Sequence, residues 1–405
     1  MNFSQTLVPL PPAALPYAAR VTFKLLQNLQ GGALTVHGPD GCARSFGSAA
    51  QGPHVRIVLN DWEVLARCAA SGDIGFAETY MEGRWSSDNL PALIALFCLN
   101  RAAIERAMYG SRLGSLVYRF KHLFNANTRK GSRKNIAAHY DLGNDFYRLW
   151  LDDTMSYSSA WFDGDRTLGM EQAQLRKYRR ALDALGSRPG QRLLEIGCGW
   201  GGLAEVAARE YGLHVTGVTL STEQLAYAQA RMARAGLGNR ADLRLMDYRD
   251  LKGQYDHIVS IEMFEAVGET YWDGYFACLK RTLKPGGRAV IQSITIDEAL
   301  FPRYRKSTDF IQQYVFPGGM LPSPAEFARR AARAGLAVDT GLRFGQDYAE
   351  TLRRWRAAFL TALPAVRAQG FDERFMRLWE FYLVYCEGAF AAGSTDVIQF
   401  DLAHA

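Results

Sequence analysis

From residue 170 onward, short apolar runs alternate with amphipathic stretches. In "EQAQLRKYRRALDALG", the residues Leu175, Tyr178, Leu182 and Leu185 follow a helical spacing, and Gly186 is a typical helix stop. The runs "QRLLEI", "HVTGVT", "DLRLM", "HIVSIEMF" and "GRAVIQSI" have the length and composition of strands, and "GGLAEVAAREYG" and "EQLAYAQARMARAG" are the helices expected between them. Repeated strand–helix units of this size predict an α/β fold with a doubly wound, Rossmann-like parallel sheet. Such a sheet binds its ligands at the carboxyl ends of the strands.

The pattern before residue 118 is different. Turn signals such as "HGPDG" (37–41) predict a small β-hairpin unit, and we interpret the following stretch, 55–85, as helices. The segment "YRFKHLFNANTRKGSRKN" (118–135) is basic and is typical of a connector. We therefore expect a small N-terminal α+β domain over 1–117, a connector over 118–135 and the catalytic domain over 136–405.

Composition narrows the class of protein. The six cysteines form no C-x-x-C pair, and H-E-x-x-H is absent, so we expect reduced thiols and no metal site. No apolar run approaches the ~20 residues of a membrane span, and the N-terminus has no positive region of the kind that precedes a signal peptide. The net charge of +6 permits an anionic partner without requiring one. We expect a cytoplasmic protein without a nucleic-acid partner.

The glycine-rich turn in "LLEIGCGWGG" fits two cofactors. Gly197, Gly199 and Gly202 satisfy G-x-G-x-x-G, but a dinucleotide site also needs an acid at the end of the second strand. That position reads "VTLS". Acids occur instead at Glu195, before the turn, and at Asp247, after the third strand. This arrangement is typical of class I S-adenosylmethionine-dependent methyltransferases, in which the first acid meets the amino-acid end of the cofactor and the second meets the adenine.

Several longer motifs carry a wider resemblance. They include "HYDLGNDF" (139–146), "MSYSSAWF" (155–162), "SIEMFEAVG" (260–268), "YVFPGGMLPS" (314–323), "FGQDYAETL" (344–352) and "FYLVYCEGAF" (381–390). In order and spacing they resemble the cyclopropane-fatty-acyl-phospholipid synthase family, including its mycolic-acid relatives. The resemblance implies methyl transfer from S-adenosylmethionine to the double bond of an unsaturated phospholipid acyl chain, through a carbocation. The cofactor site that it implies consists of Tyr157, Ser158, Glu195, Gly197, Gly199, Thr219, Leu220, Ser221, Gln224, Asp247 and Tyr248.

The same resemblance assigns the catalytic residues. Glu265 would hold a bicarbonate ion that removes a proton from the cation, and Tyr348 would bond to that ion. Cys386 matches a cysteine once considered the nucleophile of the family, although a packed thiol is our preferred interpretation because the mechanism needs no nucleophilic cysteine. We interpret Glu262 as a supporting group.

Two departures from the family leave the product open. Ser159 and Gln292 stand where the ring-forming synthases have cysteine and histidine. If removal of a proton from the new methyl group is impaired, loss of a neighbouring proton would give a methyl-branched or methylene chain and no cyclopropane ring. Two alternatives to a lipid-methylating enzyme remain: a methyltransferase for a soluble molecule and a non-catalytic lipid-binding protein. The oligomeric state is left open, with a homodimer as one option.

The expected substrate lies in a membrane, so we predict peripheral binding to the anionic inner surface through the small domain and the basic connector. Each basic residue near such a surface contributes ~1 kcal/mol and is screened by salt. Neutralising Arg129, Lys130, Arg133 and Lys134 should therefore weaken co-sedimentation with anionic vesicles, and so should high salt. Unchanged co-sedimentation in both tests would contradict this electrostatic attachment.

Overall fold

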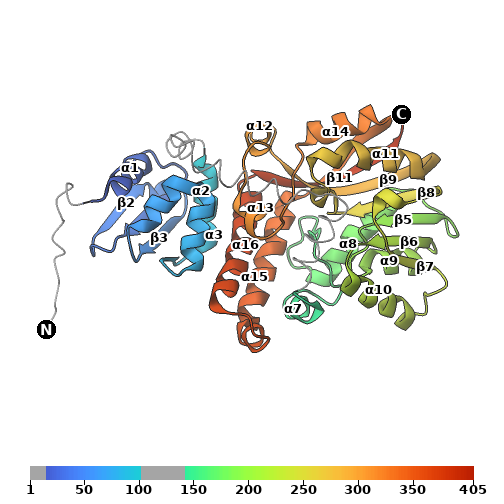
Figure 1. Cartoon of the computed structure of the whole chain (residues 1–405), viewed down its shortest axis with the longest axis horizontal. Coiled ribbons are helices and arrows are strands. Elements are labelled where there is room, and N and C mark those ends of the chain that lie inside the picture. The colour runs from blue at the N-terminus through green and yellow to red at the C-terminus, as the bar shows by residue number, and fades with distance from the viewer. Residues whose placement is uncertain (1–14, 102–141) are drawn as a thin grey trace.

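The structure, a computed structural model, describes residues 15–101 and 142–405. Two sheets lie toward opposite ends of the molecule, with long helices between them (Figure 1). The connector expected at 118–135, with the basic residues Arg129, Lys130, Arg133 and Lys134, lies outside the described residues, and the domain boundaries that we expect there remain predictions.

The larger sheet has seven strands in the order β10-β11-β9-β8-β5-β6-β7. Its parallel part consists of β5 (Arg192–Ile196), β6 (His214–Thr219), β7 (Ala241–Leu245), β8 (Tyr255–Ile261) and β9 (Leu283–Ile296). These are the five strands that the sequence predicts. Helices cover both faces, as a doubly wound fold requires: α11 (Trp272–Thr282) and α14 (Pro324–Arg333) on one, and α8 (Met170–Asp183), α9 (Gly202–Arg209) and α10 (Thr222–Arg234) on the other (Figure 1).

Two further strands make the sheet mixed. The strand β11 (Thr395–His404) pairs antiparallel with β9, and β10 (Leu336–Arg343) pairs antiparallel with β11. Neither strand is predicted from the sequence. In β10, most side chains are exposed and there is little apolar alternation. The strand β9 also begins earlier than expected, at Leu283. It contains the "KPGG" sequence, and the register of its pairing with β8 shifts over this stretch.

The smaller sheet corrects part of the N-terminal prediction. Its order is β2-β1-β3-β4, with β1 (Ala33–His37), β2 (Ala43–Gly47), β3 (His54–Leu59) and β4 (Trp85–Ser87). The strands β1 and β2 form the predicted hairpin. The expectation of helices over 55–85 was wrong at both ends, because β3 alternates buried and exposed side chains and Trp85 is buried in β4. Between them lies α2 (Glu63–Met81); α1 (Tyr17–Leu26) and α3 (Leu90–Leu99) complete this domain.

The helices α15 (Gly345–Ala368) and α16 (Glu373–Ala391) pack against each other between the two sheets (Figure 1). The helix α16 also contacts α2 and α3. The approach is close at Gly388, where an added Cβ would lie 2.6 Å from a side-chain carbon of Ile94. Polar contacts join the same elements: Tyr80 donates to Glu380 (2.8 Å) and Tyr385 donates to Asp73 (2.8 Å). The small domain is therefore docked directly on a catalytic-domain helix.

Three short helices remain in the catalytic domain. They are α7 (Asn144–Arg148), which is the first helix after residue 142, α12 (Phe301–Tyr304) and α13 (Phe310–Tyr314). The backbone N–H of Phe310 donates to Asp73 of α2 (3.1 Å), and Tyr314 donates to Glu78 of the same helix (2.5 Å). The small domain thus helps to fix α13.

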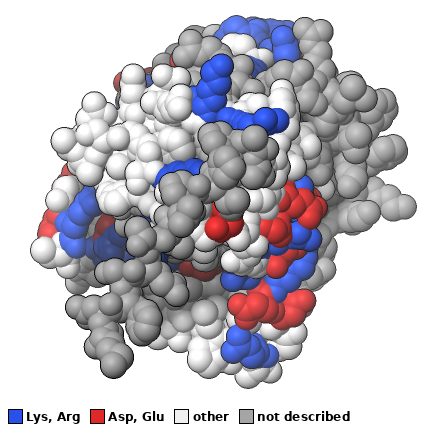
Figure 2. Space-filling view, turned by 90° about the vertical axis from the view of Figure 1, so that its left-hand side faces the viewer, with Lys and Arg blue, Asp and Glu red and all other residues white. Residues whose placement is uncertain are grey.

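The surface of the N-terminal end carries mixed charge. Figure 2 shows acidic and basic side chains together along one edge of this end and uncharged side chains over much of the remainder. Arg84, for example, is paired with Asp61, Glu63 and Glu82. Within the described ranges, no helix is long and apolar enough to cross a membrane.

Candidate active site

A cavity of about 310 Å³ opens at the carboxyl ends of β5, β6 and β8 and continues to α15 and α16. Most of the residues that the sequence assigns to the site line it, namely Tyr157, Ser158, Glu195, Gly197, Gly199, Thr219, Leu220, Gln224, Tyr248, Glu265, Tyr348 and Cys386. Ser159, Ser221, Asp247 and Gln292 are not among the lining residues. These four are buried behind the wall of the cavity.

The glycine turn forms one end of the cavity. After β5, the N–H groups of Gly197 and Cys198 both donate to the carbonyl of Val218 (2.9 and 3.0 Å). Gly197 has φ +87°, and a Cβ there would meet the side chain of Met263 at 2.8 Å. Only glycine satisfies both constraints without strain. The turn therefore brings backbone close to a ligand beside the end of β5.

Glu195, the last residue but one of β5, is suited to a cationic ligand. Its side chain is buried, and its Oε2 has no hydrogen-bond partner in the part of the chain that the structure describes. Burial raises the pKa of this carboxyl well above its usual value. The α-ammonium group of S-adenosylmethionine would supply both the missing charge and the missing donor.

The loop after β6 is fixed by local hydrogen bonds. Ser221 caps α10 by accepting from the backbone N–H of Gln224 (3.2 Å), and Thr219 donates to the side-chain oxygen of Gln224 (3.1 Å). Gln224 thus combines a place in the cavity wall with a place in the helix cap, as the sequence allowed. The role of Ser221 in the described structure is to hold this loop.

After β7, the predicted adenine-binding residues are separated. Asp247 turns to Arg249 and accepts hydrogen bonds from its guanidinium at 2.9 and 2.6 Å. Tyr248 lines the cavity, as does Met246 on the other side of Asp247. Direct contact with an adenine is therefore available to Tyr248 and Met246, and Asp247 holds the loop that presents them.

The centre of the site is Glu262, which directly follows β8. Its Oε1 accepts from the backbone N–H of Ser159 (2.9 Å) and from Nε2 of Gln292 (2.6 Å), and its Oε2 accepts from the hydroxyl of Tyr348 (2.7 Å). Sequence reasoning gave Glu262 only a supporting role. The structure instead brings three of the predicted site residues together on its carboxylate.

The backbone of Glu262 is unusual. Its φ of +49° lies in the left-handed region, where glycine is favoured and a side chain costs of order 1 kcal/mol or more. Its N–H donates to the carbonyl of Gln292 (2.8 Å), so the residue is held to β9 from both its backbone and its side chain. No local sequence signal marks this conformation. A carboxylate at the end of a buried strand was the only available indication.

Ser159 contributes differently from the expectation. Its hydroxyl, the group that replaces the cysteine thiol of the ring-forming synthases, donates to the carbonyl of Ala160 (2.9 Å), and its backbone N–H donates to the carboxylate of Glu262. Gln292 is fixed from behind, because its side-chain oxygen accepts from Nε2 of Gln399 (3.0 Å). The donors around Glu262 are therefore held in position.

Glu265 lies on the same wall, one turn further on. Its Oε1 accepts from the backbone N–H of Ile294 and from the hydroxyl of Ser293, and its buried Oε2 has no partner among the described residues. Burial and the charge of Glu262 raise the pKa of Glu265 to about 8. This raised pKa favours the protonated form of Glu265 near neutral pH.

Aromatic side chains enclose the rest of the cavity. Tyr157, Phe316 and Tyr348 line it, and Tyr382 and Phe390 from α16 join them. Phe390 stacks on Tyr348 with ring centroids 4.4 Å apart. Phe162 and Phe264 do not line the cavity and are packed in hydrophobic clusters.

Cys386, on α16, also faces the cavity. Burial raises the pKa of its thiol above its usual range, so the thiol stays protonated near neutral pH. Its environment fits the packed thiol that we preferred. No group of His, Cys, Asp and Glu within residues 15–101 and 142–405 is placed to hold a metal ion.

This fold, with its glycine turn, buried acid and cavity at the strand ends, defines a class I S-adenosylmethionine-dependent methyltransferase. The model of the mycolic acid cyclopropane synthetase family matches residues 127–400, and the chain belongs to that family.

Curated relatives are similar over most of their length. Tuberculostearic acid methyltransferase UfaA1 of Mycobacterium tuberculosis is 40% identical over 344 residues, which cover 83% of this chain and 80% of the relative. Cyclopropane-fatty-acyl-phospholipid synthase of Escherichia coli K12 is 38% identical over 349 residues, covering 85% and 86%.

A solved structure supports the same assignment. The mycolic acid cyclopropane synthase CmaA1, crystallised with SAH and CTAB, aligns with a TM-score of 0.62 and 32% identity. The alignment covers 67% of this chain and 97% of that one. The cofactor of the family is S-adenosylmethionine.

The unpartnered oxygen of Glu195 generates a binding prediction. Glu195→Gln should weaken S-adenosylmethionine binding by roughly 10- to 150-fold, because a hydrogen bond to a charged group contributes ~1.5–3 kcal/mol. NAD should not bind to either form, since β6 ends without an acid. Isothermal titration calorimetry with both cofactors tests this, and an unchanged affinity in the variant would remove Glu195 from the cofactor site.

Proposed function

We propose that this protein transfers a methyl group from S-adenosylmethionine to the double bond of an unsaturated acyl chain of a membrane phospholipid, and that Glu262 accepts the proton released afterwards. The observation that carries the proposal is the carboxylate of Glu262, which accepts hydrogen bonds from three donors beside a cavity lined by aromatic rings. The relatives support the substrate class, because their names refer to fatty-acyl phospholipids, mycolic acids and tuberculostearic acid.

When bound, S-adenosylmethionine supplies an electrophilic methyl group. The chain supplies the surroundings that the resulting carbon cation needs. Water would capture such a cation, so the cavity must be dry, and a desolvated aromatic face stabilises a cation by ~2 kcal/mol or more. Tyr157, Tyr348 and Tyr382 provide such faces beside Glu262. Tyr157 is held in place by donating to the hydroxyl of Tyr382 (2.8 Å).

The last step is loss of a proton from the alkylated chain. When the proton comes from the new methyl group, the electron pair of the broken C–H bond joins the methyl carbon to the cationic carbon and closes a ring. When it comes from a carbon next to the cation, the pair forms a double bond; a methylene group requires that a 1,2-hydride shift first move the cation to the methyl-bearing carbon. In each case the proton moves to a carboxylate oxygen of Glu262. The donors Tyr348, Gln292 and the N–H of Ser159 hold that carboxylate in its anionic form until then. They also fix its position, on which the rate of proton transfer depends.

The resemblance placed a bicarbonate ion on Glu265, with Tyr348 bonding to it. The hydroxyl of Tyr348 instead donates to Glu262 (2.7 Å), so it does not supply the hydrogen bond expected for that ion. We therefore assign no step to bicarbonate.

The two carboxyls of the site would have different roles. Burial raises the pKa of Glu262 too, but Lys177 and the three donors oppose the rise. The charge of Glu262 in turn contributes to the raised pKa of Glu265. Glu262 therefore ionises first and Glu265 holds a proton, a division of labour common to catalytic carboxyl pairs. We also propose that Glu265 contacts the substrate during catalysis.

We also propose that the product includes methyl-branched or methylene chains. A carboxylate fixed by the protein cannot follow the substrate as a free ion can, so it selects the protons nearest to it. Gln292, one of the two departures from the ring-forming pattern, is bonded to this carboxylate. A partner enzyme would complete the modification.

The site of action in this proposal is the inner surface of the membrane. The protein would bind there peripherally, with the segment 118–135 supplying the positive charge. That segment lies outside the described residues, and the vesicle experiment above tests its part.

Glu262→Gln should lower the turnover number by a factor of roughly 100 or more, because a positioned general base contributes about 10²–10⁴ in rate. The affinity for S-adenosylmethionine should be almost unchanged. Incorporation of labelled methyl groups into unsaturated phospholipid vesicles measures turnover. Glu265→Gln is the matched comparison: if it abolishes turnover while Glu262→Gln does not, Glu265 is the base.

Glu262→Gly provides a second test, because the left-handed backbone accepts glycine. This variant leaves three donors facing an emptied space. Added bicarbonate or formate should restore part of its activity and should not stimulate the wild type. Failure of every small carboxylate to restore activity would count against proton transfer at this position.

The product itself is testable by mass spectrometry and proton NMR of the extracted lipids. We expect a sizeable methyl-branched or methylene fraction from the wild type. The double change Ser159→Cys with Gln292→His should move the product toward cyclopropane. Cyclopropane lipids alone from the wild type would show that these two departures do not affect the outcome.

A further inference from the structure

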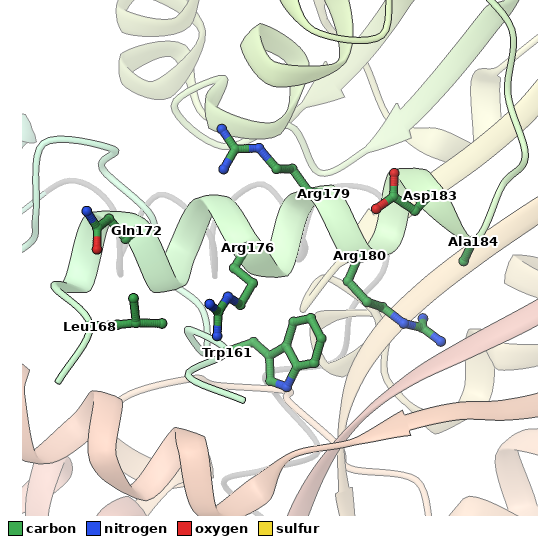
Figure 3. Close-up of a pocket in the computed structure, with 8 residues that line it drawn as sticks. All are labelled: Trp161, Leu168, Gln172, Arg176, Arg179, Arg180, Asp183 and Ala184. Atoms are coloured by element: carbon green, nitrogen blue, oxygen red, sulfur yellow. The ribbon is translucent and has the colours of Figure 1, made fainter. Parts of the chain in front are cut away.

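The helix α8 carries four cationic side chains, and one of them differs from the rest. Arg176, Arg179 and Arg180 line a surface cavity of about 680 Å³. Figure 3 shows Arg176 beside Trp161. Arg179 is paired with Glu210 (2.7 Å) and Arg180 with Asp401 (3.0 Å). This cavity therefore has its positive charge largely neutralised. The fourth cation, Lys177, points into the protein.

Lys177 is completely buried. Its Nζ donates to the hydroxyl of Ser158 (2.6 Å) and to the side-chain oxygen of Gln174 (2.6 Å), and it lies 4.3 Å from the ring centroid of Tyr178. None of these partners is charged. Burying an ammonium group without a directly bonded anion is costly, so its presence calls for a compensating charge nearby.

Two acidic groups compensate the charge of Lys177 from a distance. They are Glu262 and Asp152, and both oppose the effect of burial, which lowers the pKa of Lys177 to about 7. Asp152 already accepts hydrogen bonds from the backbone N–H and hydroxyl of Thr154. Glu262 responds in turn, since Lys177 is the largest of the influences that lower its pKa.

Lys177 also supports the loop that carries one of the donors to Glu262. It holds the side chain of Ser158, and Gln174 donates to the backbone carbonyl of the same residue (2.9 Å). The next residue, Ser159, provides the N–H that donates to Glu262. The ammonium group thus acts on the carboxylate both by its charge and through the peptide unit that joins Ser158 to Ser159.

We propose that Lys177 is a positioning residue for the methyl-transfer reaction: its buried charge keeps Glu262 ionised and ready to accept the proton. This inference rests on the proposed function, because it assigns Lys177 to the same deprotonation step. No proton leaves or enters Lys177 in that step. Its contribution is electrostatic.

The other titratable groups around the pair belong to different elements. Glu265 and Tyr348 face Glu262 from the segment after β8 and from α15, and Asp152 and Tyr178 face Lys177 from the loop after α7 and from α8. Glu265 carries no positive charge that could replace the effect of Lys177. Tyr348 keeps its proton because burial raises its pKa. Lys177 is the cation with the largest effect on the pKa of Glu262.

The test is the pH dependence of turnover for Lys177→Met. Methionine has a similar length and no charge, and without the cation the pKa of Glu262 should rise. The acid limb of the profile should therefore move to higher pH by about one unit, the usual size of the effect of one neighbouring charge. Lys177→Arg should restore most of the wild-type profile. Thermal unfolding verifies that each variant is folded.

Arg179→Met is the matched control, because it removes one positive charge from the same helix at the surface. Its profile should equal that of the wild type. If Lys177→Met lowers turnover equally at every pH, or if Arg179→Met shifts the limb as much, Lys177 does not act on Glu262 by its charge. Should Lys177→Met fail to fold, Lys177→Gln, which keeps a donor for Ser158, replaces it.

The experiment separates this inference from the function on which it rests. A wild type that methylates no acyl chain at any pH would overturn the proposed function. A wild type that is active, with a Glu262→Gln variant that is not, and an unshifted Lys177→Met profile would overturn only the role of Lys177.

Discussion

The site depends on one carboxylate that is held by donors from three separate parts of the chain. Ser159 precedes α8, Gln292 lies in the second half of β9, and Tyr348 lies in the first turn of α15. Each donor reaches Glu262 only when its own element is folded in place. The hydrogen bonds of Glu262 therefore depend on the assembly of the whole catalytic domain. The parallel strands β8 and β9 provide the rigid base, and Glu262, in a left-handed conformation directly after β8, is hydrogen-bonded to Gln292 of β9.

The small domain contributes to the site without entering it. Asp73 of α2 accepts from the hydroxyl of Tyr385 on α16 and from the backbone of α13, and both of these elements line the cavity. The wall that would contact an acyl chain is therefore set partly by residues far from the cofactor. Changes in the small domain can alter which chain fits while the methyl-transfer machinery stays intact.

The sequence was most informative where the chain repeats a regular unit. The five parallel strands and the glycine turn at Gly197 follow from periodicity and from backbone sterics, which are local properties. The strands β10 and β11 were missed because their pairing depends on contacts across the sheet. The part of Glu262 could not be derived from the sequence for a similar reason: its donors lie at positions 159, 292 and 348, and only tertiary structure brings them together.

The docking of α16 on the small domain has a consequence for biosynthesis. The contact between Tyr80 and Glu380 joins residues 300 positions apart. At a synthesis rate of about 5–20 residues per second, the partner helix emerges on the order of 15–60 s after the surface that it covers. During that interval the apolar sides of α2 and α3 are uncovered on the ribosome. The nascent chain is thus expected to need chaperone protection, and slow translation of the last third would lengthen its exposure to aggregation.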